Sequence, residues 1–216
     1  DGTVSNALTG AYGALTLNAD GQYSYATTVS AVDGLAGGVT AVDVFTYMIT
    51  DGIVSTSAEL IITVMGVNDA PVLTGSGGTL SFTEGGSALN FESSGYSLSD
   101  VDNANLASAT ITISSGFVSS EDVLAYTNTS DITGSWDSET GALTLSGLAT
   151  KAHYEAAFAT VTYQNTNKDD PNNGSRTVSW VVNDGAANSS AITSTISVGD
   201  VNDVPVLAGA GGTLSF

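Results

Sequence analysis

Short stretches in which apolar and polar residues alternate run along the whole chain, and they predict β-strands. A period of two places one row of side chains on a core and the other row in solvent. In the first third of the chain these stretches are 14–18, 22–25, 44–50 and 58–64. Further along they are 80–82, 109–113, 142–145, 161–163, 177–182 and 192–198. Short strands at this spacing are typical of a β-sandwich.

Turn-forming residues separate the predicted strands. Asp20-Gly21 and Asp51-Gly52 are hairpin signals, and we interpret both aspartates as turn residues rather than metal ligands. One short helix is expected at about 150–160, with Thr150 as its N-cap. We expect Trp180, which alternates with strand residues, to lie in the core.

An internal repeat organises the pattern. Residues 66–82 (GVNDAPVLTGSGGTLSF) and 200–216 (DVNDVPVLAGAGGTLSF) are identical at 13 of 17 positions, and the second copy begins 134 residues after the first. We therefore expect a complete unit at 72–205, preceded at 1–71 by the C-terminal part of another unit. The first strand of a third unit is expected at 206–216.

Composition narrows the function. The 216 residues hold 3 basic and 22 acidic side chains, a formal net charge of −19. Such a chain repels phosphate backbones and anionic lipid, which argues against nucleic-acid and membrane-surface binding. The absence of cysteine excludes disulfides, thiolate catalysis and cysteine-ligated zinc. The sequence contains no run of 18 or more apolar residues, so no transmembrane helix is predicted.

Oxygen donors at the predicted strand ends point to a cation. Asn68-Asp69-Ala70-Pro71 and Asn202-Asp203-Val204-Pro205 each place an amide and a carboxylate before a proline. Asp100 and Asp102 would face the same side of an extended segment. Ca²⁺ takes six to eight such oxygens. An ordinary capped turn before a strand is the alternative, but the repeat, the paired aspartates and the charge favour calcium.

These motifs resemble the calcium linkers of cadherins, because the order VNDAP, DVDN, NDG and then a second linker is the same. Residues 13–71 are similar to the C-terminal half of the VCBS repeats of giant bacterial surface proteins of the RTX type. Residues 72–205 resemble a cadherin-like repeat of the same proteins. The resemblance implies an all-β fold of tandem Ig-like antiparallel β-sandwiches, with the short helix in the second.

The resemblance also implies two sets of Ca²⁺ ligands. For the first linker they are Asp43, Asn68, Asp69, Asp100, Asp102, Asn103 and Asp184. For the second linker they are Glu84, Asp169 or Asp170, Asp200, Asn202 and Asp203. The Asp-Arg-Glu signature of cadherins is absent from both units.

The function that follows is a structural segment of a large secreted bacterial adhesin, located outside the cell. Calcium would stiffen the linkers between neighbouring repeats and extend a rod toward a glycan or protein on a cell surface. One alternative is a filament or surface layer assembled by β-strand addition through 206–216. Another is a carbohydrate- or protein-binding module centred on Trp136 or Tyr126. An enzyme is not expected, since His153 is the only histidine and is predicted to be a solvated side chain on the helix.

Overall fold

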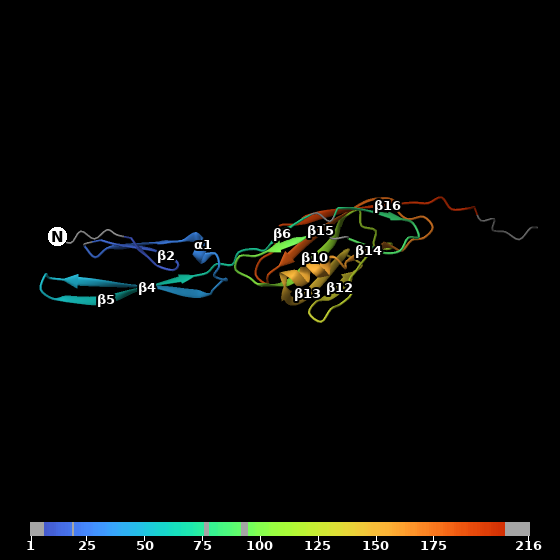
Figure 1. Cartoon of the computed structure of the whole chain (residues 1–216). Coiled ribbons are helices and arrows are strands. Elements are labelled where there is room, and N and C mark those ends of the chain that lie inside the picture. The colour runs from blue at the N-terminus through green and yellow to red at the C-terminus, as the bar shows by residue number, and fades with distance from the viewer. Residues whose placement is uncertain (1–6, 19, 76–77, 92–94, 206–216) are drawn as a thin grey trace, which may run out of the picture.

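Strands dominate the computed structural model of the chain, which describes residues 7–18, 20–75, 78–91 and 95–205. The strands form two groups that share no sheet. We call them the first unit (β1 to β5) and the second unit (β6 to β16). The two units lie end to end, joined by residues 66–71, which we call the first junction (Figure 1). The chain therefore has the expected all-β fold of tandem β-sandwiches.

The first unit has two layers. One is a three-stranded sheet in the order β1 (Leu8–Thr9), β2 (Gly13–Leu17), β3 (Tyr23–Thr27). The other is the hairpin of β4 (Thr40–Thr50) and β5 (Ser55–Met65), and a helix, α1 (Val29–Val32), connects the layers. Leu15 and Phe45 are buried between them. The expected hairpin turns contain Gly21 and Gly52, whose φ angles of 84° and 91° favour glycine.

The second unit is larger. Its main sheet has the order β12 (Thr133–Asp137), β13 (Ala142–Thr150), β10 (Asn105–Ser115), β15 (Gly174–Asn183), β16 (Ile192–Gly199), β7 (Thr79–Thr83). The opposing strands are β11 (Asp122–Ala125), β14 (Thr162–Asn165) and β8 (Leu89–Asn90). A separate two-stranded antiparallel sheet consists of β6 (Val72–Thr74) and β9 (Ser97–Ser99). Within the main sheet β7 runs parallel to β16, and the other pairs are antiparallel.

Trp180 is at the centre of the second unit and is fully buried, as expected. The rings of Phe91, Tyr96 and Phe158 pack on it at centroid distances of 5.1, 4.9 and 5.4 Å. Its indole N–H donates to Ser194 Oγ over 2.8 Å, so the buried polar atom is satisfied. Phe158 belongs to α2 (Lys151–Phe158), which confirms the predicted helix and its Thr150 N-cap.

All ten predicted strands are confirmed, and the structure adds elements that the pattern did not reveal. These are α1, β1, β6, β8, β9, β11 and β12. Each is at most five residues long, so few positions are available to show a period of two. No helix in the part of the chain that the structure describes is long and apolar enough to span a membrane. The strand expected at 206–216 lies outside the described residues.

Candidate metal centre

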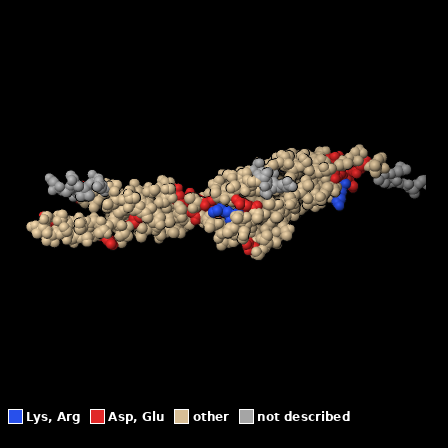
Figure 2. All heavy atoms as spheres, in the orientation of Figure 1, with Lys and Arg blue, Asp and Glu red and all other residues tan. Residues whose placement is uncertain are grey.

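The pairing of β6 with β9 brings the predicted oxygen donors of the first junction together. Val72 lies opposite Ser99 in this antiparallel pair. The residues that precede β6, 68–71, therefore lie beside the residues that follow β9, 100–103. The pairing of Ser108 with Asn183 brings the turn after β15 to the same end of the unit. Acidic atoms consequently gather at the waist between the units (Figure 2).

Five of the predicted ligands form one hydrogen-bonded network. The Asp69 amide donates to Asp102 Oδ2 over 3.1 Å, and Asn68 Nδ2 donates to Asp184 Oδ2 over 2.9 Å. Asn103 Nδ2 donates to Asn68 Oδ1 at 3.1 Å and to Asp102 Oδ1 at 3.0 Å. Hydrogen bonds thus connect the linker to two loops of the second unit, the 100–103 loop and the turn that contains Asp184.

The same linker also packs on the first unit. The amide of Gly66 donates to the carbonyl of Val39 at 2.8 Å, and the amide of Gly38 donates back to Gly66 at 3.0 Å. A Cβ atom at Gly37 would lie 3.0 Å from the Cβ of Asn68, so the backbone of the first unit reaches the network closely. The first junction is therefore in contact with both units.

Asp100, which lies beside this network, has one carboxylate oxygen without a hydrogen-bond partner among the described residues. Its Oδ1 accepts from the amides of Asp102 at 3.1 Å and Asn103 at 2.8 Å. Its Oδ2 is buried without a hydrogen-bond partner among the residues that the structure describes. Burial raises the pKa of Asp100 above its ordinary value, and the neighbouring carboxylate of Asp102 raises it further. A cation beside these two aspartates would relieve both effects.

A second acidic cluster lies at the far end of the second unit (Figure 2), where 200–205 form the second junction. Asn202 Nδ2 donates to the carbonyl of Asp203 at 2.9 Å, as Asn68 Nδ2 does to Asp69 at 2.8 Å. Glu84 Oε2 accepts from the amide of Val201 at 2.8 Å, while Glu84 Oε1 is buried without a partner in the described part of the chain. The two junctions thus share their local geometry.

The surroundings of Glu84 also shift the pKa of its carboxyl group. The hydrogen bond from Val201 lowers the pKa of Glu84. Desolvation and the nearby carboxylates of Asp200 and Asp203 outweigh it, so that the pKa is raised above its ordinary value. The structure therefore brings Glu84, Asp200 and Asp203 together.

The predicted ligand Asp43 is hydrogen-bonded within the first unit. Asp43 pairs with Ile62 inside the β4–β5 hairpin and is 3% exposed. Its carboxylate accepts hydrogen bonds from the amides of Ala11 (2.7 Å) and Tyr12 (3.1 Å) and from the hydroxyl of Tyr25 (2.7 Å). Burial raises the pKa of Asp43, but these hydrogen bonds prevail and lower it below its ordinary value. Asp43 is therefore held inside the first unit.

The loop that holds Asp169 and Asp170 is folded around the side chain of Asn167. Asn167 Oδ1 accepts from the amide of Asp169 at 3.2 Å, and Asn167 Nδ2 donates to the carbonyl of Asp170 at 2.7 Å. Asp170 lines a polar hollow of about 390 Å³ together with Glu121. The structure thus places Asp170 beside Glu121.

The chemistry of the junction donors suits a hard cation. Among the residues that the structure describes, no group of three or more acidic, histidine or cysteine side chains is arranged to hold a metal. The first junction instead combines carboxylates with the amides of Asn68 and Asn103. Both amides turn their NH₂ groups toward carboxylates. Rotation of either amide by half a turn would present its oxygen to a cation.

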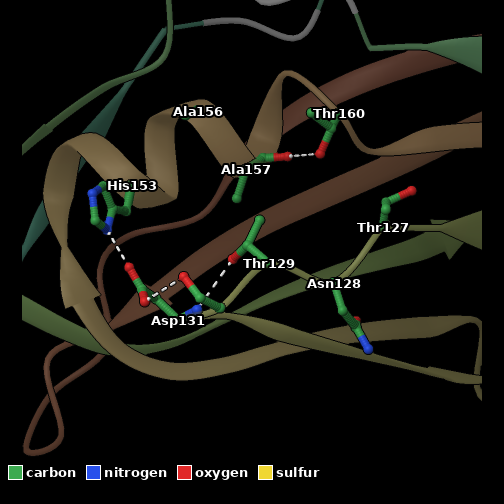
Figure 3. A pocket seen from close by; sticks show the side chains of 9 residues that line it. Thr127, Asn128, Thr129, Asp131, His153, Ala156, Ala157 and Thr160 are labelled. Atoms are coloured by element: carbon green, nitrogen blue, oxygen red, sulfur yellow. Dashed lines mark hydrogen bonds and ion pairs between the residues drawn. The ribbon is translucent and has the colours of Figure 1, made fainter.

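A hollow of about 540 Å³ lies between α2 and the 127–131 loop (Figure 3). His153 Nδ1 lies 2.9 Å from Asp131 Oδ2, and the imidazole is 56% exposed, in agreement with the expected solvated histidine. Ser130 Oγ donates to Asp131 rather than to His153. The order of hydrogen bonds therefore differs from that of a Ser-His-Asp triad, in which the serine contacts the histidine.

Comparison with known proteins gives matches only among solved structures. No protein-family model and no curated protein matches the chain. The chain is similar to "Protocadherin Gamma B2 extracellular cadherin domains 1-5" at 17% identity and a TM-score of 0.43, covering 91% of this chain and 33% of that one. For mouse cadherin-23 EC22-24 the identity is 12% and the TM-score 0.35, with 87% of this chain and 50% of that one covered. For the human desmocollin-1 ectodomain the identity is 12% and the TM-score 0.32, with 88% of this chain and 32% of that one covered. The chain thus spans half or less of the length of these three proteins.

Proposed function

We propose that the chain is a structural segment of a secreted, repeat-containing adhesin, in which Ca²⁺ bound at the two junctions stiffens the connection between successive units. The proposed boundaries of these units are 1–71, 72–205 and 206–216. The proposed ligands at the first junction are Asn68, Asp69, Asp100, Asp102, Asn103 and Asp184. At the second junction they are Glu84, Asp200, Asn202 and Asp203.

One observation carries the proposal. Each junction holds a buried carboxylate oxygen without a partner among the described residues, Asp100 Oδ2 at the first and Glu84 Oε1 at the second. Buried polar oxygens are rarely left unpaired in folded proteins. Each also lies beside another carboxylate, in a chain of net charge −19. A divalent cation would satisfy the oxygen and cancel the repulsion at the same time.

The mechanism is mechanical rather than catalytic. Without metal, the carboxylates around the linker repel one another, and hydrogen bonds from asparagine side chains and backbone amides hold them together. Calcium supplies two positive charges and accepts six to eight oxygens at once. Because the linker contacts both units, ordering it fixes one unit relative to the next. Outside the cell, even sites with a Kd of about 10⁻⁴–10⁻³ M would be filled.

The test is a thermal melt combined with limited proteolysis, in calcium and in excess EGTA. Papain suits this test because it needs no metal, and the chain has no cysteine that its reductant could affect. We expect calcium to raise the melting temperature and to suppress cleavage at 66–72, since a ligand that binds the folded state stabilises it by mass action. Asp69→Ala and Asp102→Ala should each remove most of this protection.

Asp137→Ala is the matched control. Asp137 caps a turn by accepting from the amide of Glu139 at 2.8 Å, outside both junctions. This variant should keep the full response to calcium. If calcium leaves both the melting temperature and the cleavage pattern of the unaltered chain unchanged, the rigid-junction function is wrong.

A second candidate, β-strand addition, is favoured by the pairing of β7 with β16. Leu80 lies opposite Ile196 and Phe82 opposite Val198 in this parallel pair. The β5 strand is the counterpart of β16 in the repeat, yet it pairs only with β4 among the described strands. The copy of β7 at 213–216 from another chain could occupy this edge, with Leu214 beside Ile62 and Phe216 beside Val64.

Sedimentation of the full chain tests this candidate. We expect concentration-dependent oligomers that are lost in Leu214→Asp and Phe216→Asp, since these side chains would point into the core of the acceptor. Ser215→Asp is the control, because Ser81 at the same position of the described copy is exposed. A chain that stays monomeric at all concentrations would remove strand addition from consideration.

The third alternative, a binding module centred on an exposed aromatic surface, receives less support. Trp136 is half-buried, and its ring packs edge-on against Phe117 at 6.1 Å. The hydroxyl of Tyr126 is buried. Both side chains also pack against the hydrophobic core of the second unit.

A further inference from the structure

Lys151 is one of three basic residues in the chain, and its ammonium group lies against the 100–103 loop, which contacts the first junction. Nζ donates to the backbone carbonyl of Asp100 at 3.4 Å and to that of Asn103 at a shorter distance. Figure 2 shows basic atoms beside the acidic atoms at the waist of the molecule. A fixed cation therefore holds the two ends of the 100–103 loop together.

The position of Lys151 is unfavourable for its own helix. Lys151 is the first residue of α2, and the first turn of this helix contains no acidic residue. The N-terminus of a helix carries partial positive charge and favours acidic side chains over lysine. A residue that breaks a local rule is commonly retained for an interaction elsewhere. The carbonyls of the 100–103 loop provide that interaction.

The 100–103 loop presents different groups to its two sides. The carbonyls of Asp100 and Asn103 accept from Lys151, whereas the carboxylate of Asp102 faces the linker and accepts from the Asp69 amide. Two of its amides donate inward to Asp100 Oδ1. Lysine and a bound metal would therefore stabilise the same loop conformation from opposite sides, without competing for the same oxygens.

We infer that Lys151 is a built-in cation that keeps the 100–103 loop in its ligand-bearing conformation when no calcium is bound. The inference rests on the proposed calcium function of the junction and adds a residue to it. A loop that is already ordered has less conformational entropy to lose when it binds a metal. It also follows that removal of calcium loosens the first junction only in part, because Lys151 remains in place.

The test compares Lys151→Met with Lys168→Met. Both changes remove one positive charge, but Lys168 is exposed in the 166–173 loop, outside the junction. Hydrogen–deuterium exchange is measured on peptides that cover 100–104, in EGTA and in saturating calcium. In EGTA we expect exchange at the Asp102 and Asn103 amides to be on the order of tenfold faster in Lys151→Met than in the unaltered chain. Lys168→Met should match the unaltered chain, and Lys151→Arg should restore slow exchange.

The role of Lys151 is overturned if Lys151→Met exchanges at the rate of the unaltered chain in EGTA. Calcium should return Lys151→Met to that rate, because the metal orders the loop by itself. If calcium slows exchange in none of the proteins, the calcium function fails, while the comparison in EGTA still decides the role of Lys151.

A second measurement needs no variant and keeps the inference testable if Lys151→Met does not fold. Acylation of the lysine amines in the unaltered chain is followed by mass spectrometry in EGTA. An amine that donates to two carbonyls and is half-buried should react on the order of tenfold more slowly than the exposed Lys168. Equal rates for the two lysines would contradict the inference.

Discussion

The pKa values of four carboxylates in this chain are shifted in opposite directions, depending on what donates to them. Asp43 and Asp184 accept backbone amides and side-chain donors, and the pKa of each is lowered. Asp100 and Glu84 each keep one buried oxygen without a described partner, and the pKa of each is raised. Hydrogen bonds already stabilise Asp43 and the proposed ligand Asp184 as anions, whereas Asp100 and Glu84 would gain most from a cation. Residue type alone does not separate the two groups.

Asp43→Asn tests the structural role of Asp43. We expect the free energy of unfolding of the first unit to fall by about 1–3 kcal/mol, because an amide replaces a buried carboxylate that accepts several hydrogen bonds. The loss should be equal in calcium and in EGTA, as measured by calorimetry. A loss seen only in calcium would instead support the ligand role that the cadherin resemblance implies.

The pH dependence of the same variant gives an independent check. The folded-state pKa of Asp43 is lowered, so its stabilisation is present above its ordinary pKa of about 4 and is lost as the pH falls through the folded value. Melting of the unaltered chain should therefore show a loss of stability in acid that Asp43→Asn reduces. Identical acid profiles for the two proteins would contradict the hydrogen-bonded role of the anion.

The effect of Asp100→Asn on the melting temperature should have opposite signs without and with calcium. In EGTA at pH 7 the variant should melt higher than the unaltered chain, since it removes a desolvated charge beside Asp102. Because the folded-state pKa of Asp100 is raised, this advantage should shrink as the pH falls toward about 4, where the carboxyl is protonated. In calcium the order should reverse, as a ligand has been removed. The same order of melting temperatures in both conditions would count against Asp100 as a ligand.

At the scale of elements, a buried ion pair joins the two sheets of the second unit. Asp122 in β11 and Arg176 in β15 are both almost fully buried, with Nε 3.1 Å from Oδ2. Tyr163 in β14 donates its hydroxyl to Asp122 Oδ1 at 2.6 Å. Burial and this hydrogen bond raise the pKa of Tyr163 above its ordinary value. The periodic pattern gave no sign of this pair, since charged residues in strands are normally read as outward-facing.

Asp122→Asn should destabilise the second unit by about 3–5 kcal/mol, because it leaves the buried Arg176 without its counter-charge. The double variant Asp122→Leu with Arg176→Met should recover much of the loss, since buried ion pairs are often replaceable by apolar side chains. Urea unfolding at equilibrium measures both. A double variant as unstable as the single one would show that Tyr163 and the neighbouring amides need the carboxylate in its own right.

At the scale of the whole molecule, two units lie end to end with an acidic waist between them (Figure 1, Figure 2). Under the proposed calcium function, the stiffness of the chain would depend on a few residues at the waist rather than on its two cores. Small-angle scattering should therefore show a longer and narrower distribution of distances in calcium than in EGTA. Asp69→Ala should give the EGTA profile in both conditions. Profiles of the unaltered chain that are indistinguishable with and without calcium would contradict a rigidified junction.

The sequence by itself determined the class of fold. Period-two alternation and Asp-Gly turns are local signals, and together with the 134-residue repeat they predicted ten strands, a helix at about 150–160 and the buried Trp180. Such signals work because strand periodicity and turn chemistry depend on neighbouring residues. They also drew attention to the oxygen-rich motifs before β6 and after β9, although neither of those short strands was predicted.

The cadherin resemblance had already grouped 68–69, 100–103 and 184, but only the tertiary structure decided which of their polar atoms bond to one another. The pairing of β6 with β9 brings 68–71 beside 100–103, whereas the first unit holds Asp43 among its own amides. The contact of Lys151 with the 100–103 loop spans about fifty positions and follows from the packing of α2. Burial and long-range hydrogen bonds set these outcomes. Both depend on residues far apart in sequence, so no local pattern could reveal them.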